Sequence, residues 1–296
     1  MSITSQVVIL FIIVLTGALC RKLGYFTDET IRGVTQIVVN ITVPALTIAN
    51  MQRPFSGDVL VGFLCVMALS AVLMLLALGL GLAAFRNRPQ ERRAVIAQLL
   101  GFSNCGFMGY PIILAVNPDW MIYAVGYNIS FTTIAWTIGV SLYQGRESMN
   151  LRRALLNPNI VSAVIGFVLF CTSVTLPDIP AQAISMLGGL TTPLTMLLLG
   201  TRVYGLHVSD FKDMDYHLCA AMRLVILPLA VYAVMRVLPV DAAVAGTMFI
   251  LTAMPCGTMA SMQSELYGGD KIFAARAIAY STLLSLVTVP VMSMLL

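Results

Sequence analysis

Two apolar stretches of the sequence are interrupted at their centres by residues that break helices. Residues 92–116 carry Asn104 among glycines, and residues 241–264 carry Pro255 followed by Gly257. Proline has no backbone N–H to donate and its ring clashes with the carbonyl one turn earlier, which disfavours a continuous helix by about 3 kcal/mol. We therefore expect each stretch to form two half-helices with a break between them.

Such breaks could bind an ion. The first N–H groups of each second half-helix have no partner within the helix, and the helix dipole places about half a positive charge there. Ser103 or Asn104 could cap one of these helix starts, and Pro255 suits the first turn of the other. Two such ends that converge would form an anion site without a lysine, whereas the C-terminal ends of the first half-helices could offer carbonyl oxygens to a cation.

The distribution of acidic residues favours the anion. All thirteen lie in loops or within about two turns of the end of an apolar stretch. A cationic substrate or a proton relay would need a carboxylate deeper in the membrane. The polar residues predicted inside are neutral, and they could orient a carboxylate by hydrogen bonds: Asn40, Thr42, Gln98, Asn104, Asn128 and Tyr280.

The expected site combines residues at the two breaks with residues on neighbouring stretches. It comprises Asn104, Cys105, Gly106, Pro255, Cys256 and Gly257 at the breaks, and Asn40, Thr42, Pro44 and Asn128 around them. Asn40, Gln98 and Asn128 could instead link helices by hydrogen bonds worth about 1 kcal/mol or less. We expect Arg223 and Arg276 to extend to the lipid headgroups, although Arg276 could also attract anions to an inner entrance.

The elements that hold these residues are membrane helices. The 296 residues are 59% hydrophobic and only 10% charged, which excludes a soluble domain. A helix needs about 20 apolar residues to cross a bilayer, and long unbroken runs are not the pattern of an outer-membrane barrel. We predict an all-α, polytopic protein with ten spans, over residues 5–20, 29–51, 58–85, 92–116, 119–144, 158–176, 181–204, 217–238, 241–264 and 271–296.

The basic residues predict how the chain is oriented. Fifteen of the seventeen lysines and arginines fall on one side of the predicted membrane, and only Arg53 and Arg236 fall on the other. The positive-inside rule places the fifteen in the cytoplasm, so both termini face outward from the plasma membrane, or the inner membrane of a bacterium. The net charge of +4 therefore reflects topology and not nucleic-acid binding.

Nothing in the sequence indicates an enzyme. It contains no G-x-S-x-G, H-E-x-x-H or phosphate-binding loop. His207 and His217 lie in one hydrophilic loop, and the six cysteines form no C-x-x-C pair. We expect no cofactor.

The two halves of the chain resemble each other. Pro44 and Pro193, in similar threonine-rich segments, are 149 residues apart, and Cys105 and Cys256, each followed by glycine, are 151 apart. The offset divides the chain into residues 1–150 and 151–296 with five spans each. An odd number of spans inverts the second half relative to the first, a layout found in many secondary transporters.

Three segments indicate a family. Residues 103–111, SNCGFMGYP, resemble the N-T-G-F-x-G-x-P element of the auxin efflux carrier family, within the wider bile acid and sodium symporter-like superfamily. Residues 255–268 are similar to its P-x-G…A…E-x-Y-G element, and residues 40–46 to its N-x-x-x-P-A-L stretch. Cys105 stands where the family commonly has threonine, and the long cytoplasmic loop of the plant carriers is absent.

The resemblance implies ten helices in two inverted five-helix repeats, with helices four and nine broken and crossing at the substrate site. It implies an elevator-like movement of a transport domain against a scaffold, each with helices from both halves. The substrates would be small carboxylates, such as malate or malonate, or auxin. A homodimer would fit the family.

The sequence allows more than one coupling ion and more than one function. Related symporters bind sodium beside the crossing, and Ser261, Gln263 and Ser264 leave that open here, so Na⁺, H⁺ or no ion could drive transport. We predict a secondary transporter of small organic anions that works by alternating access. The alternatives are a sodium-coupled symporter of a larger organic anion and a non-transporting receptor on the same scaffold.

Overall fold

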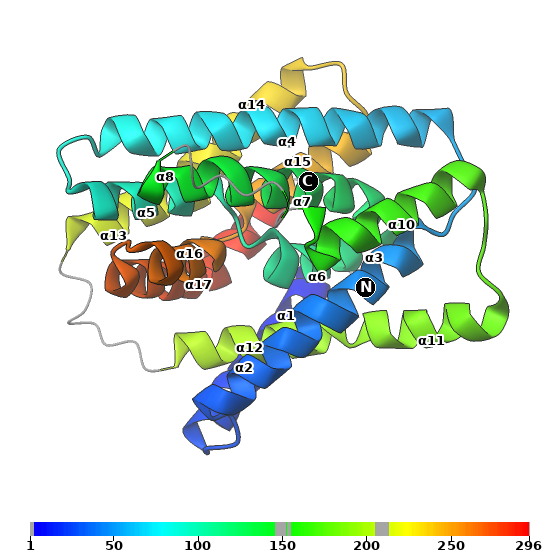
Figure 1. Cartoon of the computed structure of the whole chain (residues 1–296), viewed down its shortest axis with the longest axis horizontal. Coiled ribbons are helices and arrows are strands. Elements are labelled where there is room, and N and C mark those ends of the chain that lie inside the picture. The colour runs from blue at the N-terminus through cyan, green and yellow to red at the C-terminus, as the bar shows by residue number, and fades with distance from the viewer. Residues whose placement is uncertain (1–2, 146–151, 153–154, 205–212, 296) are drawn as a thin grey trace.

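The computed structural model describes residues 3–145, 152, 155–204 and 213–295 (Figure 1). Within these ranges the regular structure is helical, apart from one isolated β-bridge. His207 and Asp210, in the predicted hydrophilic loop, lie outside the described residues.

Helices occupy all ten predicted stretches. In the first half they are α1 (Ile3–Lys22), α2 (Asp28–Ile37), η1 (Val38–Thr42), α3 (Val43–Met51), α4 (Gly57–Ala84), α5 (Gln90–Gly101), η2 (Cys105–Gly109), α6 (Tyr110–Val116), η3 (Pro118–Trp120), α7 (Met121–Ile134), η4 (Ala135–Gly139) and α8 (Val140–Gln144). In the second half they are α10 (Pro158–Thr172), α11 (Asp178–Gly189), α12 (Thr191–Val203), α13 (Met214–Ala221), η7 (Met222–Ile226), α14 (Leu227–Val237), α15 (Ala242–Ala253), α16 (Met259–Tyr267) and α17 (Lys271–Ser293).

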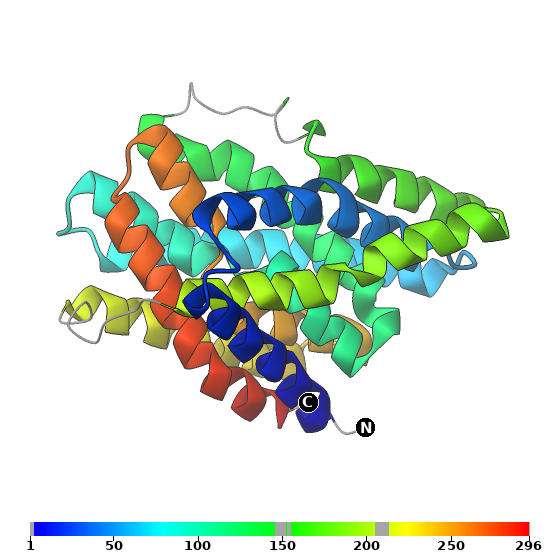
Figure 2. The same cartoon turned by 90° about the horizontal axis from the view of Figure 1, so that it is seen from below.

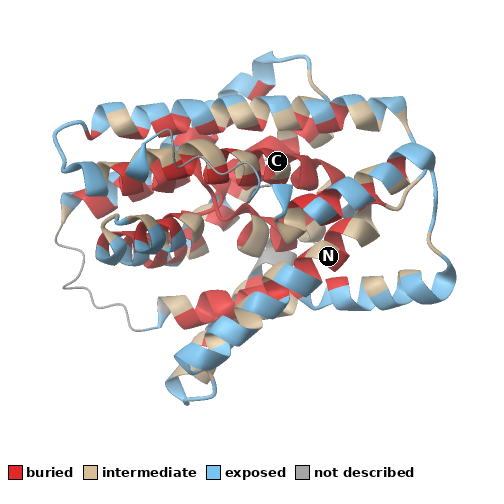
Figure 3. Cartoon of the chain, in the orientation of Figure 1, coloured by how far each residue is buried: buried red, intermediate tan, exposed pale blue. Residues whose placement is uncertain are grey.

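Several helical segments have the length and composition of membrane spans. Five of the described segments are long and apolar enough to cross a bilayer: Asp28–Met51, Gly57–Ala84, Asp178–Arg202, Met214–Val237 and Lys271–Ser293. Large apolar residues are exposed on α4, α10 and α11, and Figure 3 shows exposed residues, in pale blue, along the outward faces of these helices. This outward apolar surface is what a lipid environment requires, and the protein is a multi-pass membrane protein.

Prolines shape the helices from within. The π-helical turns η1, η2 and η7 are each followed by a proline in the first two positions of the next α-helix, at Pro44, Pro111 and Pro228. Because proline cannot donate to the preceding turn, the wider π-helical turn lets the chain continue without a full break. Another π-helical turn, η4, has no such proline.

Close helix pairs join the two halves of the chain. Gly17 of α1 and Gly200 of α12 have no room for a Cβ, because the backbone of the partner helix occupies that space. A Cβ on Gly166 of α10 would instead meet the side chain of Met51 in α3. Small residues at these positions let the helix backbones approach, which is how membrane helices associate in the absence of a hydrophobic driving force.

The turns divide between two ends of the molecule. The α1–α2, α4–α5 and α16–α17 turns lie toward the left of Figure 1, and the α3–α4 and α10–α11 turns lie at the right. Figure 2 shows α1 and α17 side by side, and the two helices are in contact.

Candidate functional site

The two predicted breaks are present, and they cross each other. α5 ends at Gly101 and the chain becomes helical again at Cys105, whereas α15 ends at Ala253 and α16 begins at Met259. Between them, Ser103 and Cys256 form an antiparallel β-bridge.

Two backbone hydrogen bonds hold the crossing. The Asn104 N–H donates to the Pro255 carbonyl (2.8 Å), and the Gly257 N–H donates to the Phe102 carbonyl (2.8 Å). Each broken helix thus satisfies backbone groups of the other, which is necessary for irregular backbone away from water.

Glycine is needed at one side of this crossing and not at the other. A Cβ on Gly257 would lie 2.8 Å from the Ser103 carbonyl oxygen and 2.9 Å from that of Phe102. A Cβ on Gly106 would have Asn128 Nδ2, at 3.7 Å, as its nearest neighbour. Gly257 therefore permits close backbone packing, whereas the absence of a side chain at Gly106 leaves space beside Asn128.

Arg223 lies at the crossing, and the prediction that it extends to the headgroups is wrong. Its side chain is buried, with the residue 2% exposed. Nη1 donates to the Leu100 carbonyl (2.8 Å), Nη2 to that of Thr252 (2.9 Å) and Nε to that of Met254 (3.1 Å). The guanidinium therefore binds the C-terminal carbonyls of α5 and of α15, which lack partners within their own helices.

The sequence did contain a signal for this role. Arg223 is a charge inside an apolar stretch, and such a residue is by default a functional candidate. Its partners lie 29 to 123 positions away in the chain, so they could not be read from local spacing.

Asn104 has an unused side-chain donor. The residue is 2% exposed, and its carbonyl accepts from the N–H groups of Met108 (3.2 Å) and Gly109 (3.0 Å) at the start of the half-helix. Its Nδ2 is buried without a hydrogen-bond partner in the described part of the chain. Leaving a buried polar group unpaired costs about 1–3 kcal/mol, so a ligand that offers an acceptor would gain from binding here.

The starts of the two second half-helices are partly accessible. Gly106 and Phe107 are half-buried at one start, and Thr258 and Met259 are half-buried at the other. Cys105, Pro255 and Cys256 are buried.

Of the surrounding predicted residues, the structure brings Asn128 to the site. It is 7% exposed on α7, its Oδ1 accepts from the Thr132 hydroxyl (3.0 Å), and its Nδ2 faces the open position at Gly106.

The residues of the second stretch form bonds within their own helix. Asn40 is exposed and donates to the Gln36 carbonyl (2.9 Å). Thr42 is buried and donates to the Val38 carbonyl (3.4 Å), and Pro44 is half-buried. Within the part of the chain that the structure describes, none of these three side chains forms a hydrogen bond with either break.

Gln98 and Gln263 form a buried bridge between the broken helices. Gln98 Nε2 donates to Gln263 Oε1 (2.6 Å) and to the Gly139 carbonyl (2.8 Å), and Gln263 Nε2 donates to the Ala135 carbonyl (2.8 Å). The Gln263 side-chain oxygen, considered above as a sodium ligand, is thus already an acceptor. Ser261 is half-buried, and its carbonyl accepts from the Ser264 hydroxyl (2.7 Å).

The end of the molecule that contains the α4–α5 turn carries a separate ion-pair cluster. Arg88 pairs with the buried Asp215 (2.8 Å), and Arg92 pairs with Asp213 and Asp215. Burial alone would raise the pKa of Asp213, but hydrogen bonds from the Asp215 N–H and the Arg92 guanidinium lower it below its ordinary value. His217 belongs to α13 and not to the expected loop, and its Nδ1 lies 2.8 Å from the Tyr280 hydroxyl.

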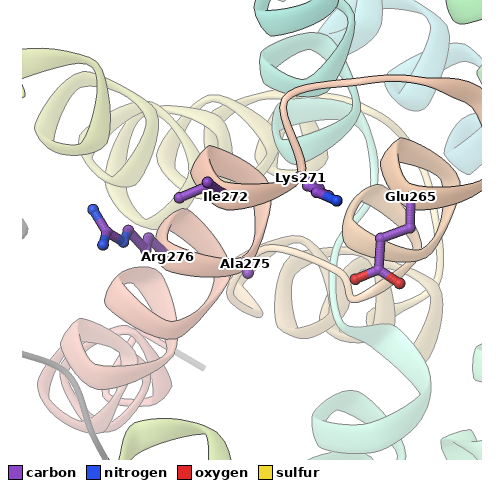
Figure 4. A pocket seen from close by; sticks show the side chains of 5 residues that line it. All are labelled: Glu265, Lys271, Ile272, Ala275 and Arg276. Carbon is purple, nitrogen blue, oxygen red and sulfur yellow. The ribbon is translucent and has the colours of Figure 1, made fainter.

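A surface groove of about 590 Å³ lies between α16 and α17, away from the breaks (Figure 4). It is lined by Glu265, Lys271, Ile272, Ala275 and Arg276. Arg276 is exposed, as expected for an arginine near the headgroups.

Comparison with known proteins gives two kinds of match. The family described as "Membrane transport protein" matches residues 2–293. An uncharacterized transporter of Methanothermobacter thermautotrophicus is 24% identical over 306 residues, which cover 100% of this chain and 99% of the relative. An uncharacterized transporter of Methanocaldococcus jannaschii is 22% identical over 301 residues, which cover 96% and 95%.

Proposed function

Because the chain belongs to the membrane transport protein family, we propose that it is a secondary transporter that carries small organic anions, in particular carboxylates, by alternating access. Membership of this family confirms the resemblance to the auxin efflux carriers and identifies the chain as a transporter and not an enzyme. The substrate and the mechanism are the content of the proposal.

One observation carries it: two broken helices cross where the buried Nδ2 of Asn104 has no hydrogen-bond partner among the described residues. The starts of both second half-helices are partly accessible beside the crossing, and each carries the positive end of a helix dipole. The unpaired Asn104 Nδ2 is a donor in the same place. Donors and positive dipole ends together suit a carboxylate.

Packing supports two inverted repeats, residues 1–150 and 151–296. α1 packs on α12, and α10 packs on α3. In each pair the first span of one half meets the second span of the other, as related halves would require. The bridge between Ser103 and Cys256 joins the fourth spans of the two halves in the same way.

The same packing suggests how access alternates. α1, α3, α10 and α12 form the scaffold in our proposal, and the helices that carry the breaks form a transport unit that moves against it. α12 contacts η2, so this movement would carry the binding site past the scaffold. The turns rich in basic residues, gathered at one end of the molecule, face the cytoplasm in this arrangement, and both termini face outward.

Flux into proteoliposomes tests the function. Purified protein is reconstituted and offered radiolabelled malate, malonate, succinate and indole-3-acetate, with protein-free liposomes as the control. Saturable flux of at least one carboxylate, inhibited by the unlabelled compound, is the expected result. Sodium-dependent flux of a larger organic anion alone would favour the symporter alternative, and binding without flux would favour a receptor.

A further inference from the structure

The charge of Arg223 is not paired with a carboxylate. Among the residues that the structure describes, no Asp or Glu lies within the 4.0 Å of an ion pair with its guanidinium. Its partners are three carbonyls at the ends of α5 and α15. A buried charge is costly unless its surroundings compensate it, so these helix ends must act as the counter-charge.

At the crossing, the negative helix ends are neutralised by Arg223, whereas the positive helix starts are not neutralised. A helix C-terminus carries about half a negative charge, so the ends of α5 and α15 together offer about one, which matches the single positive charge of Arg223. The starts of the two second half-helices carry about half a positive charge each and have no such partner in the described chain. The crossing as a whole is therefore short of about one negative charge, the charge of a carboxylate.

Converging helix C-termini are also the geometry in which a transporter can hold a metal cation by backbone carbonyls. Here the guanidinium occupies that position: its planar fork donates to carbonyls of both helices at once. The Gln263 side-chain oxygen already accepts one hydrogen bond, from Gln98 Nε2.

We propose that Arg223 is a built-in cation that takes the place of a bound coupling cation between the two half-helix ends, so that this carrier binds its anion without sodium. The inference rests on the proposed function. Arg223 has a positioning role in this proposal. Its three described hydrogen bonds go to backbone carbonyls of the crossing and not to the anion.

The test measures cation binding directly. Purified full-length protein is titrated with NaCl against choline chloride at constant ionic strength, and ²²Na⁺ binding and the melting temperature are recorded. The wild type is expected to show no saturable ²²Na⁺ binding and no sodium-specific rise in melting temperature. Saturable sodium binding to the wild type would overturn the proposal.

Substitutions sharpen the test. Arg223→Met removes the charge and frees the carbonyls, so it is expected to melt earlier in choline chloride and to gain a saturable, sodium-specific stabilisation. Arg223→Lys keeps the charge and should stay indifferent to sodium. Arg236→Met, the same change at an exposed position in α14, is the control and should behave as the wild type.

Each result has a distinct meaning. A folded Arg223→Met protein that does not bind sodium would contradict the proposal, and if that variant does not fold, Arg223→Gln takes its place with the same expectation. Absence of carboxylate flux from a wild type that is indifferent to sodium would overturn the proposed function and leave the assignment of Arg223 intact.

Discussion

The two breaks occupy equivalent places in the two halves of the chain, but their surroundings differ. At the second break, Cys256 donates its N–H to the Ser281 hydroxyl (3.2 Å), Met254 accepts from Arg223, and Gly257 lies against the backbone of Ser103. At the first break, Asn104 Nδ2 has no hydrogen-bond partner among the described residues, and a Cβ on Gly106 would contact only Asn128 Nδ2, at 3.7 Å.

This difference indicates a division of labour. The backbone of the second break, from Met254 to Gly257, is hydrogen-bonded to neighbouring elements and holds the crossing in shape. The first break retains an unused amide donor on Asn104 and, in the described part of the chain, has no close neighbour around Gly106 except Asn128. A binding site needs both properties. A rigid support fixes the geometry, and an unsatisfied donor gains a hydrogen bond when the ligand binds, which favours binding.

The largest effect is expected at the second break, from Gly257→Ala. Its methyl group would approach two backbone oxygens within 2.9 Å, and backbone cannot move aside as a side chain can. We expect a loss of stability of about 3 kcal/mol, seen as a lower melting temperature and a lower yield of monodisperse protein in detergent. A variant as stable as the wild type would refute the tight crossing.

Asn104→Ala tests the first break. It is expected to reduce affinity for the best carboxylate about tenfold, or 1.4 kcal/mol, measured by equilibrium binding. Because the buried Nδ2 is unpaired, its removal should not lower the melting temperature of the ligand-free protein. Equal losses of affinity and stability would make Asn104 structural, as Gly257 is.

Ser281→Ala is the matching change beside the second break. It leaves the buried Cys256 N–H without its acceptor, so we expect a loss of stability of about 1 kcal/mol. Affinity measured in the same binding assay should remain within error of the wild type. A change of affinity without a change of stability would reverse the roles we assign to the two breaks.

The smallest effect is expected from Gly106→Ala. The new methyl group would meet only Asn128 Nδ2, at an ordinary contact distance of 3.7 Å, so the protein should fold and melt as the wild type does. The methyl takes space at the accessible start of the half-helix, and we expect affinity to fall about threefold, or ~0.7 kcal/mol. Gly257→Ala is the same chemical change at a position where backbone atoms already fill the space of the methyl group.

The sequence determined by itself where helices form and where they break. Long apolar runs and basic turns are local features, and so is the effect of Pro255 on a helix. The ten helical stretches and both breaks therefore coincide with the prediction.

Only the tertiary structure decided which groups meet. The sequence gives the distance of Arg223 from the end of its helix, and that distance led to the prediction that it reaches the headgroups. It does not give the carbonyl partners of Arg223, which lie at the ends of two other helices. The same holds for Asn40, which bonds its own helix, and for Asn104, whose Nδ2 has no hydrogen-bond partner in the described part of the chain. Helix formation depends on neighbours within one turn, whereas the partner of a buried side chain depends on how distant helices pack, and no local pattern encodes that.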